Sequence, residues 1–259
     1  MIDGHFLLQR PVAPPGNDWV DPSYAYGSTS QGVRLPHHGV EFYNASGIPV
    51  LASADGSVVV AGNDQSILYS PWKNFYGNLI ILEHHLPGVE QTVYTLYAHL
   101  SKIEVTAGQT VEAGERIGLV GATGSAQGSH LHFEVRLVEN TYQNTRNPVL
   151  WLFPAQDENG RSAGVLAVRV ADESGKLLQV ALSVQYYPNP DQPPSRTLQP
   201  EAYAVETVNG DDTWGENYAL TDLEAGKYRI SLLHRGVLYE QWVDIEPGRL
   251  TLVSFIVTK

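Results

Sequence analysis

The stretch "GSHLHFEVRL" (residues 128–137) decides the interpretation of the fold, because its apolar and polar residues alternate. A period of two over eight residues is typical of a half-buried β-strand, whose apolar set faces a core while the polar set shares the other face. On that polar face His130 and His132 would start roughly 6.6–7 Å apart. This spacing suits one metal ligand and one neighbour that takes part in chemistry. Glu134 and Arg136 follow on the same face, where they either orient His132 or form a plain cross-strand ion pair.

The composition of the chain excludes several classes of function. Its 259 residues include 16 Lys and Arg against 28 Asp and Glu, a net charge of -12. Non-specific nucleic-acid binding needs basic side chains to neutralise phosphate, so no nucleic-acid partner is expected. Cysteine is absent, which excludes disulfides and thiol chemistry. No apolar run approaches the ~20 residues of a membrane-spanning helix, and the start of the chain lacks the features of a signal peptide.

Short alternating runs separated by glycine-containing turns fill most of the remaining chain, with few credible helices. They predict an all-β protein: an antiparallel β-sandwich or barrel-sandwich domain, followed by a smaller β-sandwich. Seven of the nine histidines lie between residues 37 and 132, which marks the first domain as the functional one. Residues 164–187 are expected to form a hairpin. The predicted organisation is an N-terminal extension that wraps the first domain (1–30), the histidine-rich domain (31–153), a linker (154–163) and an accessory domain (164–259).

The absence of familiar catalytic motifs leaves metal chemistry built from separated histidines. No nucleophile elbow, phosphate-binding loop, dinucleotide fingerprint or H-E-x-x-H helix occurs. In "PHHGVEF", His37 and Glu41 are four residues apart, with Gly39 between them to let the backbone bend. Hydrolytic zinc sites commonly take three N or O ligands and keep one position for water. His37, Glu41 and His132 would supply two imidazoles and one carboxylate, and His99 in "YAHLS" is a candidate general base.

Three separated motifs resemble those of the lysostaphin-type zinc endopeptidases, which cut peptide cross-links in bacterial peptidoglycan. They are "HHGVEF", "YTLYAHLS" and "VTAGQTVEAGERIGLVGATGSAQGSHLHFEVR", in the family's order, and the resemblance covers residues 25–153. It implies an antiparallel β-sandwich with a groove over Zn²⁺. The site residues that it implies are the metal ligands His37, Glu41 and His132 and the catalytic residues His99 and His130. The family has an aspartate where this chain has Glu41, whose side chain is one methylene longer.

The resemblance implies a peptidoglycan peptide as substrate and an extracellular or cell-envelope location, with the leader absent from this chain. The bond that is cut, the oligomeric state and the choice between His99 and His130 as general base stay open. A rival interpretation is a catalytically silent protein that binds the cell wall or regulates another enzyme, with Glu41 as the sign of a decayed site. A biotin or lipoyl carrier is disfavoured, because the turn "SADGSVV" (53–59) offers no lysine.

The C-terminal region resembles prealbumin-like or carboxypeptidase-regulatory β-sandwiches through "LEAGKYRISL" and "VDIEPGRLTLVSFIV". It contains no catalytic cluster. Among the other histidines, His38 is expected to be structural, since alternation turns it away from its neighbour. His84 and His85 end a predicted strand before a Pro-Gly turn, and both are expected to be exposed to solvent.

Overall fold

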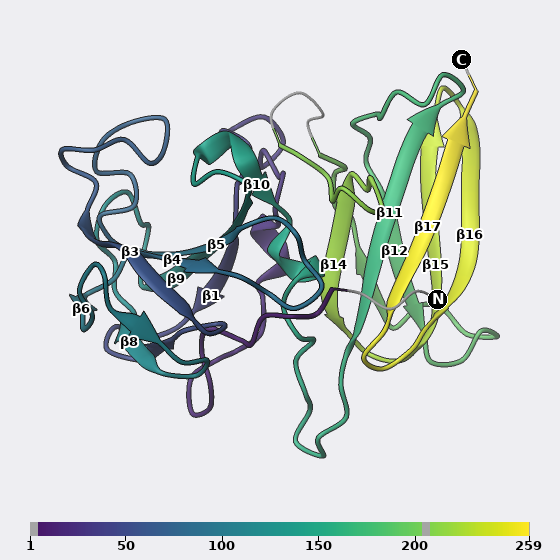
Figure 1. The fold of residues 1–259 in the computed structure, drawn as a ribbon. Coiled ribbons are helices and arrows are strands. Elements are labelled where there is room, and N and C mark those ends of the chain that lie inside the picture. Colours follow the sequence, from purple (N-terminus) through teal and green to yellow (C-terminus); the bar gives the residue numbers. More distant parts are fainter. Residues whose placement is uncertain (1–4, 204–207, 259) are drawn as a thin grey trace. The chain divides into compact units, whose positions relative to one another are not determined.

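The computed structural model describes residues 5–203 and 208–258, which fold mainly into β-strands and their connections (Figure 1). Packing divides the chain into two units. Residues 6–23 and 38–153 form one, called here the N-terminal unit. Residue 5, residues 24–37 and the described residues from 154 onward form the other, called the C-terminal unit. Within the described residues, no helix has the length and apolar character needed to cross a membrane.

The N-terminal unit is built around a large antiparallel sheet in the order β1-β9-β5-β4-β3-β7, with β10 also paired to β9. The strands of this sheet are β1 (Val40–Tyr43), β3 (Gly56–Asn63), β4 (Asn78–His84), β5 (Val93–Ala98), β7 (Thr110–Val111), β9 (His130–Leu137) and β10 (Thr145–Arg146). A smaller sheet joins β2 (Pro49–Leu51), β8 (Arg116–Leu119) and β6 (Lys102–Ile103). Three short 3₁₀ helices lie in connections: η1 (Pro22–Tyr24), η2 (Tyr142–Asn144) and η3 (Pro148–Leu150).

Strand β9 is the "GSHLHFEVRL" strand, and it is buried on both faces. All eight of its residues are buried, so the predicted strand is confirmed but its half-buried character is wrong. The apolar residues fill the core as expected. The polar face is also covered: Leu96 and Ala98 of β5 are the cross-strand partners of Glu134 and His132, and Tyr76 from the loop before β4 packs with them. A buried polar group must find hydrogen-bond partners inside the protein, and the histidine-bearing face of β9 therefore has to satisfy its charges internally.

The end of β4 departs from the sequence interpretation in the same way. His84 is fully buried, and only its neighbour His85 is exposed, with 80% of its side chain accessible. The Nδ1 of His84 donates to the backbone oxygen of Asp55 at 2.8 Å, and its Nε2 lies 2.7 Å from the Thr95 hydroxyl. Because β4 lies between β3 and β5, its last residue is covered by its neighbours and not by solvent.

The described residues of the C-terminal unit form two sheets, in the orders β14-β11-β17 and β13-β12-β15-β16. Their strands are β11 (Gly164–Asp172), β12 (Ser183–Tyr187), β13 (Arg196–Leu198), β14 (Tyr218–Leu223), β15 (Gly226–His234), β16 (Val237–Ile245) and β17 (Leu250–Val257). The predicted hairpin over 164–187 is wrong, because β11 and β12 belong to different sheets. Each contributes its apolar face to one shared core. Strand β11 runs parallel to β17, which lies beside it in Figure 1, while the other strand pairs are antiparallel. The all-β, mainly antiparallel prediction is confirmed.

Residues 24–37 pack with the C-terminal unit, although the sequence interpretation divides them between the extension 1–30 and the histidine-rich domain. The ring of Tyr26 meets that of Tyr203 edge-on at 5.2 Å, and its hydroxyl donates to the backbone oxygen of Asn209 at 3.1 Å. The chain passes from this segment to the N-terminal unit at the peptide bond between His37 and His38. The predicted domain ranges stay a prediction.

Candidate metal centre

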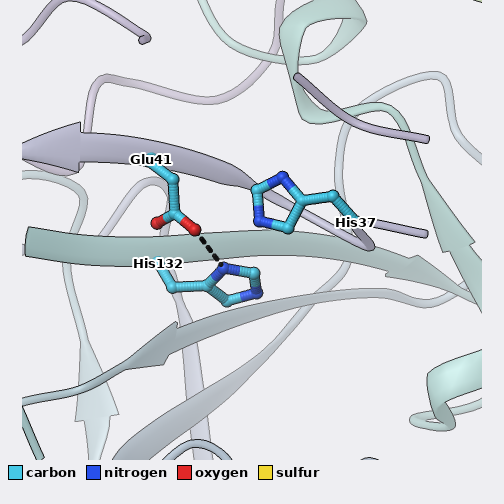
Figure 2. Close-up of side chains that lie close together, drawn as sticks. All are labelled: His37, Glu41 and His132. Atoms are coloured by element: carbon cyan, nitrogen blue, oxygen red, sulfur yellow. Dashed lines mark hydrogen bonds and ion pairs between the residues drawn. The ribbon is translucent and has the colours of Figure 1, made fainter. Parts of the chain in front are cut away.

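Three of the predicted site residues come together in one buried cluster. One ligand-type atom from each of His37, Glu41 and His132 lies within 4.8 Å of the others, and all three residues are buried. Figure 2 shows the Glu41 carboxylate and the two rings close together. Glu41 and His132 are direct cross-strand partners on β1 and β9, and His37 precedes β1 by three residues. Two imidazole nitrogens and one carboxylate oxygen are a donor set that Zn²⁺ commonly takes.

The close approach of β1 to β9 depends on Gly39. A Cβ at this position would lie 2.5 Å from the backbone oxygen of Phe133 and 2.7 Å from the Cε1 atom of His132. The chain bends at Gly39, as expected, although the φ of this glycine is not positive. The glycine is required for space, because any side chain would push against the ring of His132.

The hydrogen bonds of the two imidazoles define which nitrogen faces the cluster. The Nδ1 of His37 lies 2.8 Å from the backbone oxygen of Tyr24. The imidazole of His37 also stacks on the ring of Tyr24, with the ring centroids 4.0 Å apart. A carbonyl only accepts, so the proton of His37 is on Nδ1 and Nε2 is the ligand-type nitrogen. In His132 the roles are reversed: Nε2 lies 3.0 Å from Glu134 and Nδ1 lies 3.1 Å from Glu41.

The two remaining predicted site residues lie beside this cluster. The ring centroid of His99 is 4.8 Å from that of His130 and 5.8 Å from that of His132. The Nδ1 of His99 donates to the Thr123 backbone oxygen at 2.9 Å, which makes its Nε2 the basic nitrogen. His99 also has a positive φ of 62°, a conformation that costs an L-residue about 1–2 kcal/mol. The structure therefore brings all five predicted residues together, on segments far apart in the sequence.

His130 contacts two groups that can only accept hydrogen bonds. Its Nδ1 lies 3.1 Å from the backbone oxygen of Gly128, and its Nε2 lies 3.2 Å from Glu41 Oε2. Its Nδ1 therefore donates to Gly128, and its Nε2 faces the carboxylate of Glu41. The exposed ring of Tyr43, the cross-strand neighbour of His130, lies 5.6 Å from it.

Charge shifts the protonation of two of these histidines in opposite directions. Burial alone would lower the pKa of His132, but the negative charges of Glu41 and Glu134 outweigh burial and raise it to about 9. Burial, together with the charges of His132 and His130, lowers the pKa of His99 to about 3. His99 is therefore a neutral base at neutral pH, while a metal ion must displace a proton from the Nδ1 of His132.

Glu134 both orients His132 and forms the ion pair with Arg136, so the two roles expected for it are present together. One carboxylate oxygen of Glu134 accepts from His132, and the other lies 2.7 Å from Arg136 Nη2. Sequence reasoning missed a further member, Tyr76, whose hydroxyl donates a hydrogen bond to Glu134. Tyr76 lies in a loop before β4 that has no periodic pattern, so no local signal pointed to it. His38, as expected, lies apart from the ligand set: it stacks on Tyr142 and pairs with Thr145.

The fold and the site place this chain among the β-sheet proteins with a candidate zinc site of two histidines and one carboxylate. Residues 35–146 match the model of peptidase family M23, so this part of the chain is an M23 domain. The five site residues all fall within the matched range.

Several known proteins are similar to this region. The chain is 41% identical over 107 residues to the peptidoglycan DD-endopeptidase ShyB of Vibrio cholerae. The aligned region covers 41% of this chain and 21% of ShyB. It is 42% identical over 101 residues to the DD-carboxypeptidase/endopeptidase Mpg of Neisseria meningitidis, covering 39% of this chain and 20% of Mpg. The chain thus spans about a fifth of the length of each relative. Among solved structures, the catalytic domain of lysostaphin from Staphylococcus simulans is 32% identical, with 48% of this chain and 86% of that chain covered and a TM-score of 0.40.

Proposed function

We propose that this protein is a zinc metalloendopeptidase that hydrolyses peptide cross-links of bacterial peptidoglycan, and that it works outside the cell or in the cell envelope. The observation that carries the proposal is the cluster of His37, Glu41 and His132, with His99 and His130 beside it. The M23 domain and the peptidoglycan-cutting names of its relatives support the choice of substrate.

The donor set fits a zinc ion, which His37, Glu41 and His132 would hold. When bound, the ion would supply Lewis-acid polarisation of the scissile carbonyl and a bound water that is acidic near neutral pH. Ligand-type nitrogens and a carboxylate oxygen face one another in the cluster. The ring hydrogen bonds of His37 and His132 hold their orientations, as hydrogen bonds beyond the ligands do in zinc proteins generally.

The hydrogen bonds of the two other histidines suggest different roles for them. His99 is neutral at neutral pH and presents a basic Nε2, so we assign it the role of accepting the proton of the attacking water. His130 is fixed through its Nδ1 and directs its Nε2 toward the cluster, so we assign it the donation of a hydrogen bond to the developing oxyanion of the tetrahedral intermediate. The exposed ring of Tyr43 beside His130 offers a surface for the substrate.

The test is digestion of purified peptidoglycan by the wild type, His99→Ala and Glu41→Asp, with the products identified by mass. We expect the wild type to release cross-link peptides and His99→Ala to lose on the order of 10²–10⁴-fold in rate, the usual contribution of a general base. Glu41→Asp should retain or gain activity if the shorter carboxylate reaches the same ion. Full activity of His99→Ala would overturn its assignment as the base.

The presence of Glu41 at a position where the family has aspartate supports a second candidate, a non-catalytic wall-binding protein. The two candidates differ in metal content. Near-stoichiometric zinc per chain after purification without added metal supports the enzyme, whereas its absence together with retained binding to cell walls supports the silent protein.

A further inference from the structure

A group of buried polar residues lies behind His132, on the side away from Glu41. Glu134, Arg136 and Tyr76 have no exposed surface. Oxygen Oε1 of Glu134 accepts from both the Tyr76 hydroxyl and His132 Nε2, while Oε2 accepts from Arg136 Nε at 2.8 Å. Arg136 Nη2 in turn donates to the Tyr76 oxygen at 3.0 Å. Each member therefore fixes another, and the carboxylate oxygen that holds His132 is shared with Tyr76.

Tyr76 is itself held rigidly by its main chain. Its N–H donates to the carboxylate of the fully buried Asp64 at 2.8 Å, and the next N–H, that of Gly77, donates to the same carboxylate at 3.0 Å. Asp64 also accepts from the N–H of Asn74 through its backbone oxygen at 3.0 Å, which closes the loop 64–77 on itself. The hydroxyl of Tyr76 is consequently presented from a fixed backbone.

The same residue also reaches the other side of the site. The backbone oxygen of Tyr76 accepts from the N–H of His99 at 2.9 Å, at the residue with the positive φ. Tyr76 thus touches the histidine assigned as base through its main chain, and the metal-ligand histidine through Glu134. A residue that only filled space in the core would need neither contact.

We propose that Tyr76 is a positioning residue: through Glu134, its hydroxyl holds the His132 ring in the orientation that directs Nδ1 to the metal ion. This role rests on the proposed zinc site. If the Tyr76 hydroxyl is removed, Oε1 of Glu134 keeps only one donor and the Glu134 carboxylate gains rotational freedom. The ring of His132, which this carboxylate holds, then gains freedom as well. Outer partners of metal-bound histidines typically contribute 10–100-fold in metal affinity.

The chain offers a matched control in Tyr97. This tyrosine is also fully buried in the same unit, where its hydroxyl oxygen accepts from the N–H of Ser53 at 2.8 Å and from Thr95 at 3.0 Å. On β5 the cross-strand partner of Tyr97 is Phe133, so its side chain lies on the sheet face opposite to His132. Tyr97→Phe and Tyr76→Phe therefore both remove one buried hydroxyl, but only the second removes a contact to the site.

The experiment measures the dissociation constant for Zn²⁺ of the full chain by competition with a chelator of known affinity, for the wild type, Tyr76→Phe and Tyr97→Phe. We expect Tyr76→Phe to bind zinc about 10–100-fold more weakly and Tyr97→Phe to bind within about twofold of the wild type. The visible spectrum of the Co²⁺-substituted protein should shift in Tyr76→Phe alone, because the ligand field changes when the His132 ring turns.

The outcomes separate the positioning role from the function on which it rests. A wild type that binds zinc tightly, with Tyr76→Phe equally tight and spectrally unchanged, would overturn the positioning role and leave the proposed enzyme intact. Equal weakening in both variants would also overturn it, since the effect would then follow from any lost buried hydroxyl. A wild type that binds no zinc would overturn both proposals.

Discussion

Two glutamates, one in each unit of the molecule, are buried to the same extent, but burial shifts only one of them to the neutral form. Glu134 in the N-terminal unit and Glu216 in the C-terminal unit both have no exposed surface. Burial raises the pKa of both, and for Glu216 it prevails and raises the pKa to about 8. For Glu134 the guanidinium of Arg136 and the ring of His132 outweigh burial and lower the pKa to about 2.

The difference lies in the partners. Glu216 accepts from the N–H of Asp211 at 2.7 Å and from the Tyr203 hydroxyl at 3.2 Å, and both of these donors are neutral. The two neutral donors of Glu216 do not offset the desolvation of its carboxylate, whereas the guanidinium of Arg136 does so for Glu134. Strand β9 thus maintains a buried negative charge where a histidine must be held, while the C-terminal unit protonates its buried acid.

The largest effect is expected from removing the cation that ionises Glu134. Arg136→Met leaves a buried carboxylate without its main partner, and we expect the free energy of unfolding to fall by about 3–5 kcal/mol. The matched control is Lys227→Met, which breaks the exposed pair between Lys227 and Asp244 at 3.1 Å and should cost less than about 1 kcal/mol. Urea denaturation of both variants measures the two values. Similar losses in the two variants would mean that the buried pair matters no more to stability than the exposed one.

These buried groups also mark the limit of what the sequence could predict. The alternation in 130–137 predicted the strand and its shared polar face, because a period of two is a local property. The grouping of positions 37, 41, 99 and 132 came from the chemistry of their side chains together with the family resemblance, since pairing between distant strands leaves no trace in local spacing. Full burial of β9 could not be predicted, because Tyr76, which packs on its polar face, comes from a loop without periodicity. The mistaken hairpin at 164–187 has a related cause: two alternating runs pair equally well with each other or with distant strands.

The next effect, which develops only as the pH rises, is expected at Glu216. Its folded pKa of about 8 lies above the ordinary value of 4.5. The unfolded chain therefore loses this proton first, so the contribution to stability is complete below pH 4.5 and declines as pH rises to about 8. A difference of one in pKa between the folded and the unfolded chain corresponds to about 1.4 kcal/mol, and we expect a loss of a few kcal/mol between about pH 5 and pH 9. The groups closest to this carboxyl are Asp211, which pairs with His5 at 3.0 Å, and the hydroxyl of Tyr203.

Glu216→Gln isolates that contribution, because glutamine does not titrate and leaves the His5–Asp211 pair in place. Denaturation midpoints of the wild type and the variant should diverge steadily from about pH 5 to pH 9, with the variant becoming the more stable of the two at high pH. Parallel curves over this range would mean that Glu216 is ionised in the folded protein, and the contrast with Glu134 would disappear.

The smallest effect tests whether the charge balance around Glu134 depends on the position of its histidine neighbour. Gly39→Ala places a methyl group against the ring of His132, and we expect about 1–3 kcal/mol of destabilisation from overpacking together with weaker zinc binding. Gly62→Ala is the control: nothing lies within 4 Å of its added Cβ, its φ is not positive, and its stability should change by less than about 1 kcal/mol. Because Glu216 lies in the other unit, its pH dependence should be the same in Gly39→Ala as in the wild type. If Gly39→Ala bound zinc as tightly as Gly62→Ala, the ring of His132 would have room to yield, and Gly39 would be a requirement of the strand contact alone.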